Sequence, residues 1–256
     1  MNYKGMIKYL PAVLLLCACT ENELLLRERE QQFAVRFSAS GVCTEVATRT
    51  ASPLADGTML RILAFRRVGE SPDLSTDKYM GEGTYKAING DGTLAAVSSL
   101  LLRTGTYDFY ALTPDLAVAD AGRSGAGVTC AVSVGHGVDY ATSLTPGQTV
   151  SEASPAVALH DLNRHCTKLI FALQPKAGNI TSVSVESAGL TNMTQAPVTA
   201  SLHSALPVAG VAQTDALTIA GDKIFHAGRG RKKTSASAVT LPREASEFRF
   251  KMKAAF

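Results

Sequence analysis

The sequence predicts an all-β protein. In many short segments, apolar residues alternate with polar ones, as they do in half-buried strands. Gly, Pro, Asn and Asp gather between these segments, where turns are expected. The chain beyond its leader has no convincing helix-length repeat of apolar residues. Many short strands separated by turns are typical of β-sandwiches.

The first half of the chain contains the clearest strands. Phe33, Val35 and Phe37 alternate with polar or small residues, which predicts a strand with one buried face. A second strand is expected in "MLRILAFRR", after the turn-rich "ASPLADGT". The "NGDG" at 89–92 predicts a hairpin, because Asn and Gly adopt positive φ at little cost. "TYDFYAL" predicts a strand that ends before Pro114, and "TCAVSVG" predicts a short one.

A second series of strands begins near Pro155. The expected segments are residues 168–173, "NITSVSVES", "VTASLH", "DALTIA", "SAVTL" and "FRFKMK". In the last of these, Phe248, Phe250 and Met252 alternate with three cationic residues, which predicts one apolar and one cationic face. We expect two domains, an N-terminal one over 33–160 and a C-terminal one over 161–256, after a polar tether at 19–32.

The first 18 residues predict a lipoprotein signal peptide. Lys4 and Lys8 precede an apolar run that is about half the ~20 residues of a spanning helix. The run ends in Leu16-Cys17-Ala18-Cys19, which resembles the bacterial lipobox. Cys19 would then be the first mature residue and carry acyl chains such as palmitate, and two or more chains anchor firmly. The alternative is an ordinary cleaved signal with an incidental pair of cysteines.

Composition excludes several classes of function. The chain has 256 residues and a net charge of only +3, so no strong field favours nucleic acid. Hydrophobic content is 46%, enough for a core, and tryptophan is absent. Beyond the leader and Cys19, the cysteines are Cys43, Cys130 and Cys166, without metal-ligand spacing. Either one pair forms a disulfide, which the sequence does not identify, or all three are buried thiols.

The order of the segments resembles the fimbrillin superfamily of Bacteroidales. The resemblance is carried by the lipobox with the acidic "TENE", by "FAVRFSAS" with "TRT" and "GTMLRILAFRR", by "LLRTGTYDFYALTP", and by "VDYATS" with "SPAVALHDLNRHCTKLIFALQP". It implies two transthyretin-like β-sandwich domains in a surface-exposed lipoprotein of the outer membrane. It also implies a fimbrial subunit with a structural or adhesive role, not an enzyme, that needs no cofactor.

The resemblance implies a mechanism of assembly. An arginine-specific protease cuts the loop after the first strand, and a donor strand from another fimbrial subunit fills the vacated groove. Arg49 is the best candidate for the cut, although an exposed loop arginine needs no such role. Phe33, Val35 and Phe37 would belong to the removable strand, and Cys19 would be the lipid site.

The short C-terminus departs from the family pattern. The chain stops at "FRFKMKAAF", so no donor strand remains if its own domain needs that segment. In that case we expect an accessory, tip or anchor-type subunit or a truncated gene product. The alternative is a lipoprotein that does not polymerise and binds a glycan or peptide on a host or bacterial surface.

Three other motifs contain residue types that occur in functional sites. "HDLNRHC" at 160–166 has the residue types of a metal site, but alternate side chains of a strand point oppositely, which favours a structural segment. "AGRSGAG" around Ser124 has Ala126 where a hydrolase elbow needs Gly. "GRGRKKTS" lacks phosphate-loop spacing and reads as a solvated loop or a glycan-contacting patch. We expect no catalytic residues and no metal.

Overall fold

The computed structural model confirms the all-β prediction, because every regular element it describes is a strand. It describes residues 32–43, 52–120, 130–173, 184–202, 204–207, 215–219, 224–225, 234–242 and 249–255. The leader, Cys19 and Arg49 lie outside these ranges. Across the described ranges, no helix is long and apolar enough to cross a membrane. The strands are β1 (Phe33–Ala34), β2 (Arg36–Ala39), β3 (Val42–Cys43), β4 (Met59–Arg66), β5 (Lys78–Ile88), β6 (Thr93–Ser98), β7 (Leu101–Leu102), β8 (Gly105–Thr113), β9 (Ala131–Val134), β10 (Ala141–Val150), β11 (Ala156–Leu159), β12 (Leu162–Arg164), β13 (Thr167–Leu173), β14 (Ser184–Met193), β15 (Val198–Ser201), β16 (Asp215–Ile219), β17 (Ile224–Phe225), β18 (Thr234–Thr240) and β19 (Arg249–Ala255).

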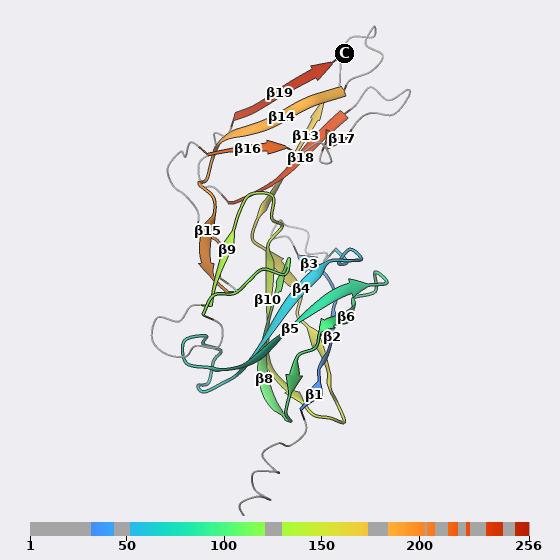
Figure 1. Ribbon diagram of the computed structural model, residues 1–256, viewed down its shortest axis with the longest axis vertical. Helices are drawn as coiled ribbons and strands as arrows, with labels where there is room; N and C mark the ends of the chain where they lie inside the picture. The colour runs from blue at the N-terminus through green and yellow to red at the C-terminus, as the bar shows by residue number, and fades with distance from the viewer. Residues whose placement is uncertain are drawn as a thin grey trace, which may run out of the picture.

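A nine-stranded sheet forms the larger part of the fold, in the order β11-β2-β6-β5-β4-β8-β10-β12-β3 (Figure 1). The predicted hairpin is confirmed, since β5 and β6 pair antiparallel around the "NGDG" turn. Asn89 and Gly90 adopt φ of 63° and 61° there, the left-handed values that this turn requires.

The central strand β4 is buried on both faces of the sheet. Leu60 and Ile62 point into one apolar cluster, which also contains Phe109. Leu63 and Phe65 point into a second cluster, which also contains Tyr140. Burial on both faces explains why "LRILAF" is almost continuously apolar instead of alternating.

Strand β10 was not predicted, because Pro146 and Gly147 in its middle are typical of a loop. The ladder between β10 and β8 shifts register between Thr145 and Gln148, so the two residues form a bulge within a continuing strand. Gly147 has a φ of 64°, which a residue with a side chain adopts only with strain.

Two three-stranded sheets lie at the other end of the molecule, in the orders β13-β18-β17 and β16-β14-β19 (Figure 1). A third apolar cluster, which includes Leu190 and Ala236, joins them. The rings of Phe171 and Phe250 stack across it with centroids 3.8 Å apart. In β19 the predicted alternation is confirmed, since Phe250 and Met252 pack on this cluster and the cationic residues between them are exposed.

Strand β15 crosses the boundary that we expected between the two domains. It pairs antiparallel with β9, although it belongs to the second half of the sequence. Ala200 of β15, and Leu202 and Leu206 after it, belong to the second cluster, with Leu63 and Cys130. The division into domains at residues 33–160 and 161–256 stays a prediction.

Candidate functional site

Residues 33–43, here called the first strand, form β1, which pairs with β7 in a separate two-stranded sheet, and then β2 and β3, which belong to the nine-stranded sheet. Strand β2 lies between β11 and β6, so main-chain groups of the sheet flank it on both sides. It runs parallel to β11 from Arg36 opposite Ala156 to Ala39 opposite Leu159. The same parallel alignment continues where β3 meets β12. The middle of the first strand, β2, is therefore an interior strand, whereas β3 lies at an edge of the nine-stranded sheet.

The apolar side chains of the first strand help to fill the first cluster. Val35 and Phe37 are only 2% and 4% exposed, and Phe33 is partly buried against the same cluster. The ring of Phe37 makes edge-to-face contacts with Tyr85 and Phe109, at centroid distances of 5.0 and 5.2 Å. Loss of this strand would open the core between β11 and β6.

The hydroxyl of Tyr85 joins the first strand to its neighbours. It donates to the carbonyl of Val35 at 3.0 Å and accepts from the N–H of Leu100 at 2.9 Å. The main chain of Val35 also donates to the carbonyl of Leu100 at 3.0 Å. Burial raises the pKa of Tyr85, so the hydroxyl stays protonated and remains a donor.

Gly92, in the hairpin turn, lets the first strand approach β6. The N–H of Ala39 donates to the carbonyl of Gly92 at 2.9 Å. A Cβ on Gly92 would stand 2.5 Å from the carbonyl oxygen of Ala39. The φ of Gly92 is 87°, which residues with a side chain rarely adopt. Sequence reasoning assigned this glycine to the turn alone. Its second role needs knowledge of a strand that lies far away in the chain.

The "HDLNRHC" segment holds the far end of the first strand. The carboxylate of Asp161 accepts hydrogen bonds from the Ser40 hydroxyl and, at 3.6 Å, from the Cys43 thiol. His165 Nε2 contacts the Thr142 hydroxyl at 2.7 Å. In the described part of the chain, no three His, Cys, Asp or Glu side chains gather as metal ligands. These contacts match the structural interpretation of the motif.

Val42 and Ser52, which flank the segment that contains Arg49, lie next to each other. Val42 and Ser52 form an antiparallel bridge, with N–H to carbonyl distances of 2.9 and 3.1 Å. Arg49 itself, Cys19 and Ser124 lie outside the described residues, as does most of "GRGRKKTS". The structure therefore describes the first strand, but neither the proposed cut nor the proposed lipid site.

The three cysteines carry thiols in the structure. Cys130 is completely buried in the second cluster, and Cys166 is partly buried against it. Cys43 is partly buried, and its thiol donates to the carboxylate of Asp161. This arrangement corresponds to the thiol alternative and not to a disulfide.

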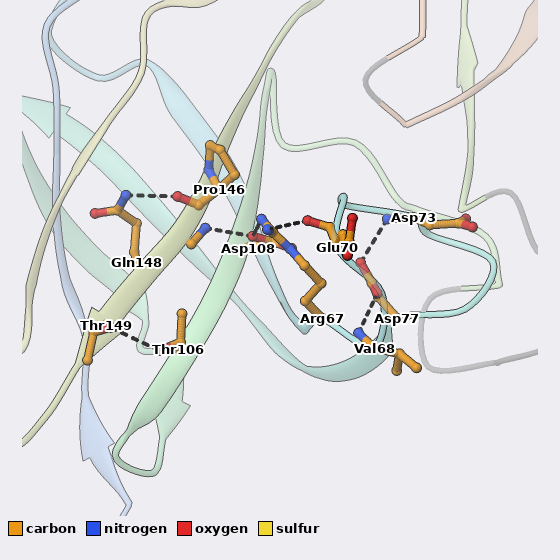
Figure 2. A network of polar contacts seen from close by, with 11 residues as sticks. Arg67, Val68, Glu70, Asp73, Asp77, Thr106, Asp108, Pro146, Gln148 and Thr149 are labelled. Atoms are coloured by element: carbon orange, nitrogen blue, oxygen red, sulfur yellow. Dashed lines mark hydrogen bonds and ion pairs between the residues drawn. The ribbon is translucent and has the colours of Figure 1, made fainter.

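A network of polar contacts surrounds the completely buried Asp108 on β8 (Figure 2). Arg67 donates to both of its carboxylate oxygens, at 2.9 and 2.6 Å. The N–H of Gly147, in the bulge of β10, donates to the same carboxylate at 2.6 Å. The hydrogen bond to Asp108 raises the pKa of Arg67, whose charge compensates that of the buried acid. The bulge thus satisfies an acid that sequence reasoning missed.

The next loop closes on a second buried carboxylate, Asp77. Its oxygens accept from the N–H of Val68 at 2.9 Å and from that of Asp73 at 2.8 Å (Figure 2). A cavity of about 350 Å³ opens beside the Arg67–Asp108 pair, lined also by Arg66 and Tyr107. A larger cavity of about 610 Å³ lies at the opposite end of β8, beside Pro114.

Comparison with known proteins gives a fold and no sequence family. The sequence matches no family model and no curated protein. A candidate cell adhesion protein from Bacteroides fragilis superimposes with a TM-score of 0.56 at 15% identity, over 87% of this chain and 83% of that one. A candidate adhesin from Bacteroides ovatus gives 0.41 at 12% identity, over 88% and 72%. The fimbrial anchor protein Mfa2 from Porphyromonas gingivalis gives 0.37 at 10% identity, over 87% and 78%. The first similarity establishes that this chain shares its fold with a candidate cell adhesion protein.

Proposed function

We propose that this chain is a lipid-anchored surface subunit of a fimbria, with a structural or adhesive role, that assembles by β-strand addition. The observation that carries the proposal is the interior position of β2, the middle of the first strand, in the nine-stranded sheet. The shared fold with a candidate cell adhesion protein supports a place at the cell surface. Such a subunit functions by binding and assembly, so we assign no catalytic residue.

The packing of the first strand makes its exchange energetically plausible. Burying the side chains of Val35 and Phe37 contributes roughly 1.5–3 kcal/mol each. This is a large part of the ~5–15 kcal/mol that holds a typical domain together. A chain that lost its first strand would also expose the main-chain groups of β11 that now face β2. The cut protein would therefore gain stability from any strand with a matching pattern.

Cleavage at Arg49 is the step to test first. We expect an arginine-specific protease to cut the folded chain after Arg49 and to leave Arg36 intact until the strand is released. The Arg49→Lys variant is the matched control, because it keeps the charge and removes the protease site. Mass spectrometry identifies the cut, and size-exclusion chromatography follows assembly.

A peptide with the sequence of residues 32–43 then tests the groove. After the protease is inhibited, this peptide should restore the stability of the cut protein. The same peptide with Val35→Ser and Phe37→Ser should not. A cut protein that stays a stable monomer and ignores both peptides would contradict strand addition. It would favour the second candidate, a surface lipoprotein that binds a glycan or peptide without polymerising.

The lipid anchor needs its own test. The Cys19→Ala variant should leave the membrane fraction or accumulate with its leader uncut, whereas Cys17→Ala should behave as the original chain. The reason is that Cys17 leaves with the signal peptide and Cys19 carries the acyl chains. Equal detergent partitioning of both variants would disprove the anchor.

A further inference from the structure

The cavity beside β8 contains an arginine whose charge the described structure does not compensate. Arg67, on one side of the cavity, is engaged with the carboxylate of Asp108 through two nitrogens and with the carbonyl of Glu70 through the third. Its charge and that of Asp108 cancel. Arg66 also lines the cavity and forms no ion pair with a carboxylate in the part of the chain that is described. The charged side chains of the cavity therefore sum to one positive charge.

Tyr107 holds the guanidinium of Arg66 in place. The guanidinium carbon lies 5.5 Å from the centre of the Tyr107 ring, and Nη2 is 3.3 Å from its hydroxyl oxygen. The Tyr107 hydroxyl donates in turn to the carbonyl of Arg103 at 2.9 Å, so two hydrogen bonds hold this hydroxyl in place. Arg66 is exposed, and its Nε and Nη1 groups have no acceptor in the described chain. Nη2 carries two hydrogens and donates one to Tyr107, so its second hydrogen can act with Nε–H or Nη1–H as a fork for a carboxylate.

The remaining walls of the cavity are small and polar. A Cβ on Gly105 would come within 3.1 Å of both Arg66 Nη2 and the Tyr107 hydroxyl, so glycine leaves room beside the guanidinium. Thr106 also lines the cavity, and its hydroxyl lies 2.9 Å from that of Thr149 on β10 (Figure 2). A volume of about 350 Å³ is at the lower end of small-molecule sites.

We propose that this cavity binds an acidic sugar residue, with its carboxylate on Arg66 and a hydroxyl on Thr106. The single positive charge favours a monoanion over a phosphate dianion. The polar wall at Thr106 favours a sugar over an apolar side chain. The proposal goes beyond assembly, since none of the residues that line the cavity belongs to the first strand.

The test is a ligand-observed NMR titration of the full, uncut chain with D-glucuronate. D-glucose, inorganic phosphate and the peptide carboxylate acetyl-alanyl-alanine are titrated in parallel. We expect saturable binding of glucuronate that weakens with added salt. Arg66→Gln should weaken it roughly 10-fold or more, because it removes a charge-assisted hydrogen bond. Arg66→Lys should fall between, since lysine keeps the charge and loses the fork.

Arg249→Gln provides the matched control, because it removes an exposed arginine from β19 at the other end of the molecule. It should leave glucuronate binding unchanged. Gly105→Ala should weaken glucuronate binding and leave the melting temperature of the chain unchanged. This variant therefore separates loss of the site from loss of the fold. The proposal is overturned if glucuronate does not saturate, or if it binds Arg66→Gln as well as the original chain. Binding of glucose, phosphate or the peptide as tight as that of glucuronate would overturn it equally.

Discussion

The contribution of the first strand to the core can be measured through Phe37. Its side chain is 4% exposed and contacts the rings of Tyr85 and Phe109 edge to face. Truncation of a buried Phe to Ala costs about 3–5 kcal/mol, and each aromatic pair adds about 0.5–1.5 kcal/mol beyond its buried area. We therefore expect Phe37→Ala to lower the free energy of unfolding by an amount near the top of the 3–5 kcal/mol range.

Equilibrium unfolding in urea, followed by circular dichroism, is the assay. With a slope of about 1–3 kcal/mol per molar urea, the midpoint should fall by roughly 1 M or more. If unfolding proceeds in two steps, the affected step is that of the nine-stranded sheet. Phe33→Ala is the matched control, because its ring is only partly buried against the same cluster and should cost clearly less.

Two results would refute this reasoning. A loss below about 1 kcal/mol would mean that the ring of Phe37 is not an integral part of the core. An equal loss from Phe33→Ala would mean that the burial of a side chain does not determine how much it contributes to the free energy of unfolding.

Tyr85→Phe should lower the free energy of unfolding by about 1–3 kcal/mol, since a buried main-chain N–H loses its acceptor; urea midpoints check this, and an unchanged midpoint contradicts it. Gly92→Ala should lower the melting temperature by more than Gly90→Ala. Both glycines have a positive φ, but only a Cβ at position 92 would meet Ala39. Equal melting temperatures would disprove the close approach. Burial raises the pKa of the Cys130 thiol, so the reactive thiolate forms only at higher pH. Iodoacetamide should therefore spare Cys130 in the folded chain and modify it in concentrated urea, which peptide mass spectrometry can show. Rapid modification of the folded chain would argue against the buried position.

Local sequence patterns predicted most strands and one turn. The alternation in β2 and β19 identified which residues face inward, because successive side chains of a strand point to opposite faces. Asn89 and Gly90 identified a hairpin, because the turn geometry depends on two adjacent residues alone. Strand β10 escaped prediction, since Pro146 and Gly147 mark a loop unless a buried acid such as Asp108 requires a bulge at that place.

The sequence by itself determined that this chain folds as strands, where most of them lie, and which faces are apolar. Only the tertiary structure decided which strands are neighbours. Ser40 meets Asp161 across 121 residues of sequence, and Arg66 meets Tyr107 across 41. The physical reason is that period-two alternation records burial on one face of a strand, whereas main-chain pairing is nearly the same for every sequence. Side-chain packing between distant segments therefore selects the partner and creates the sites.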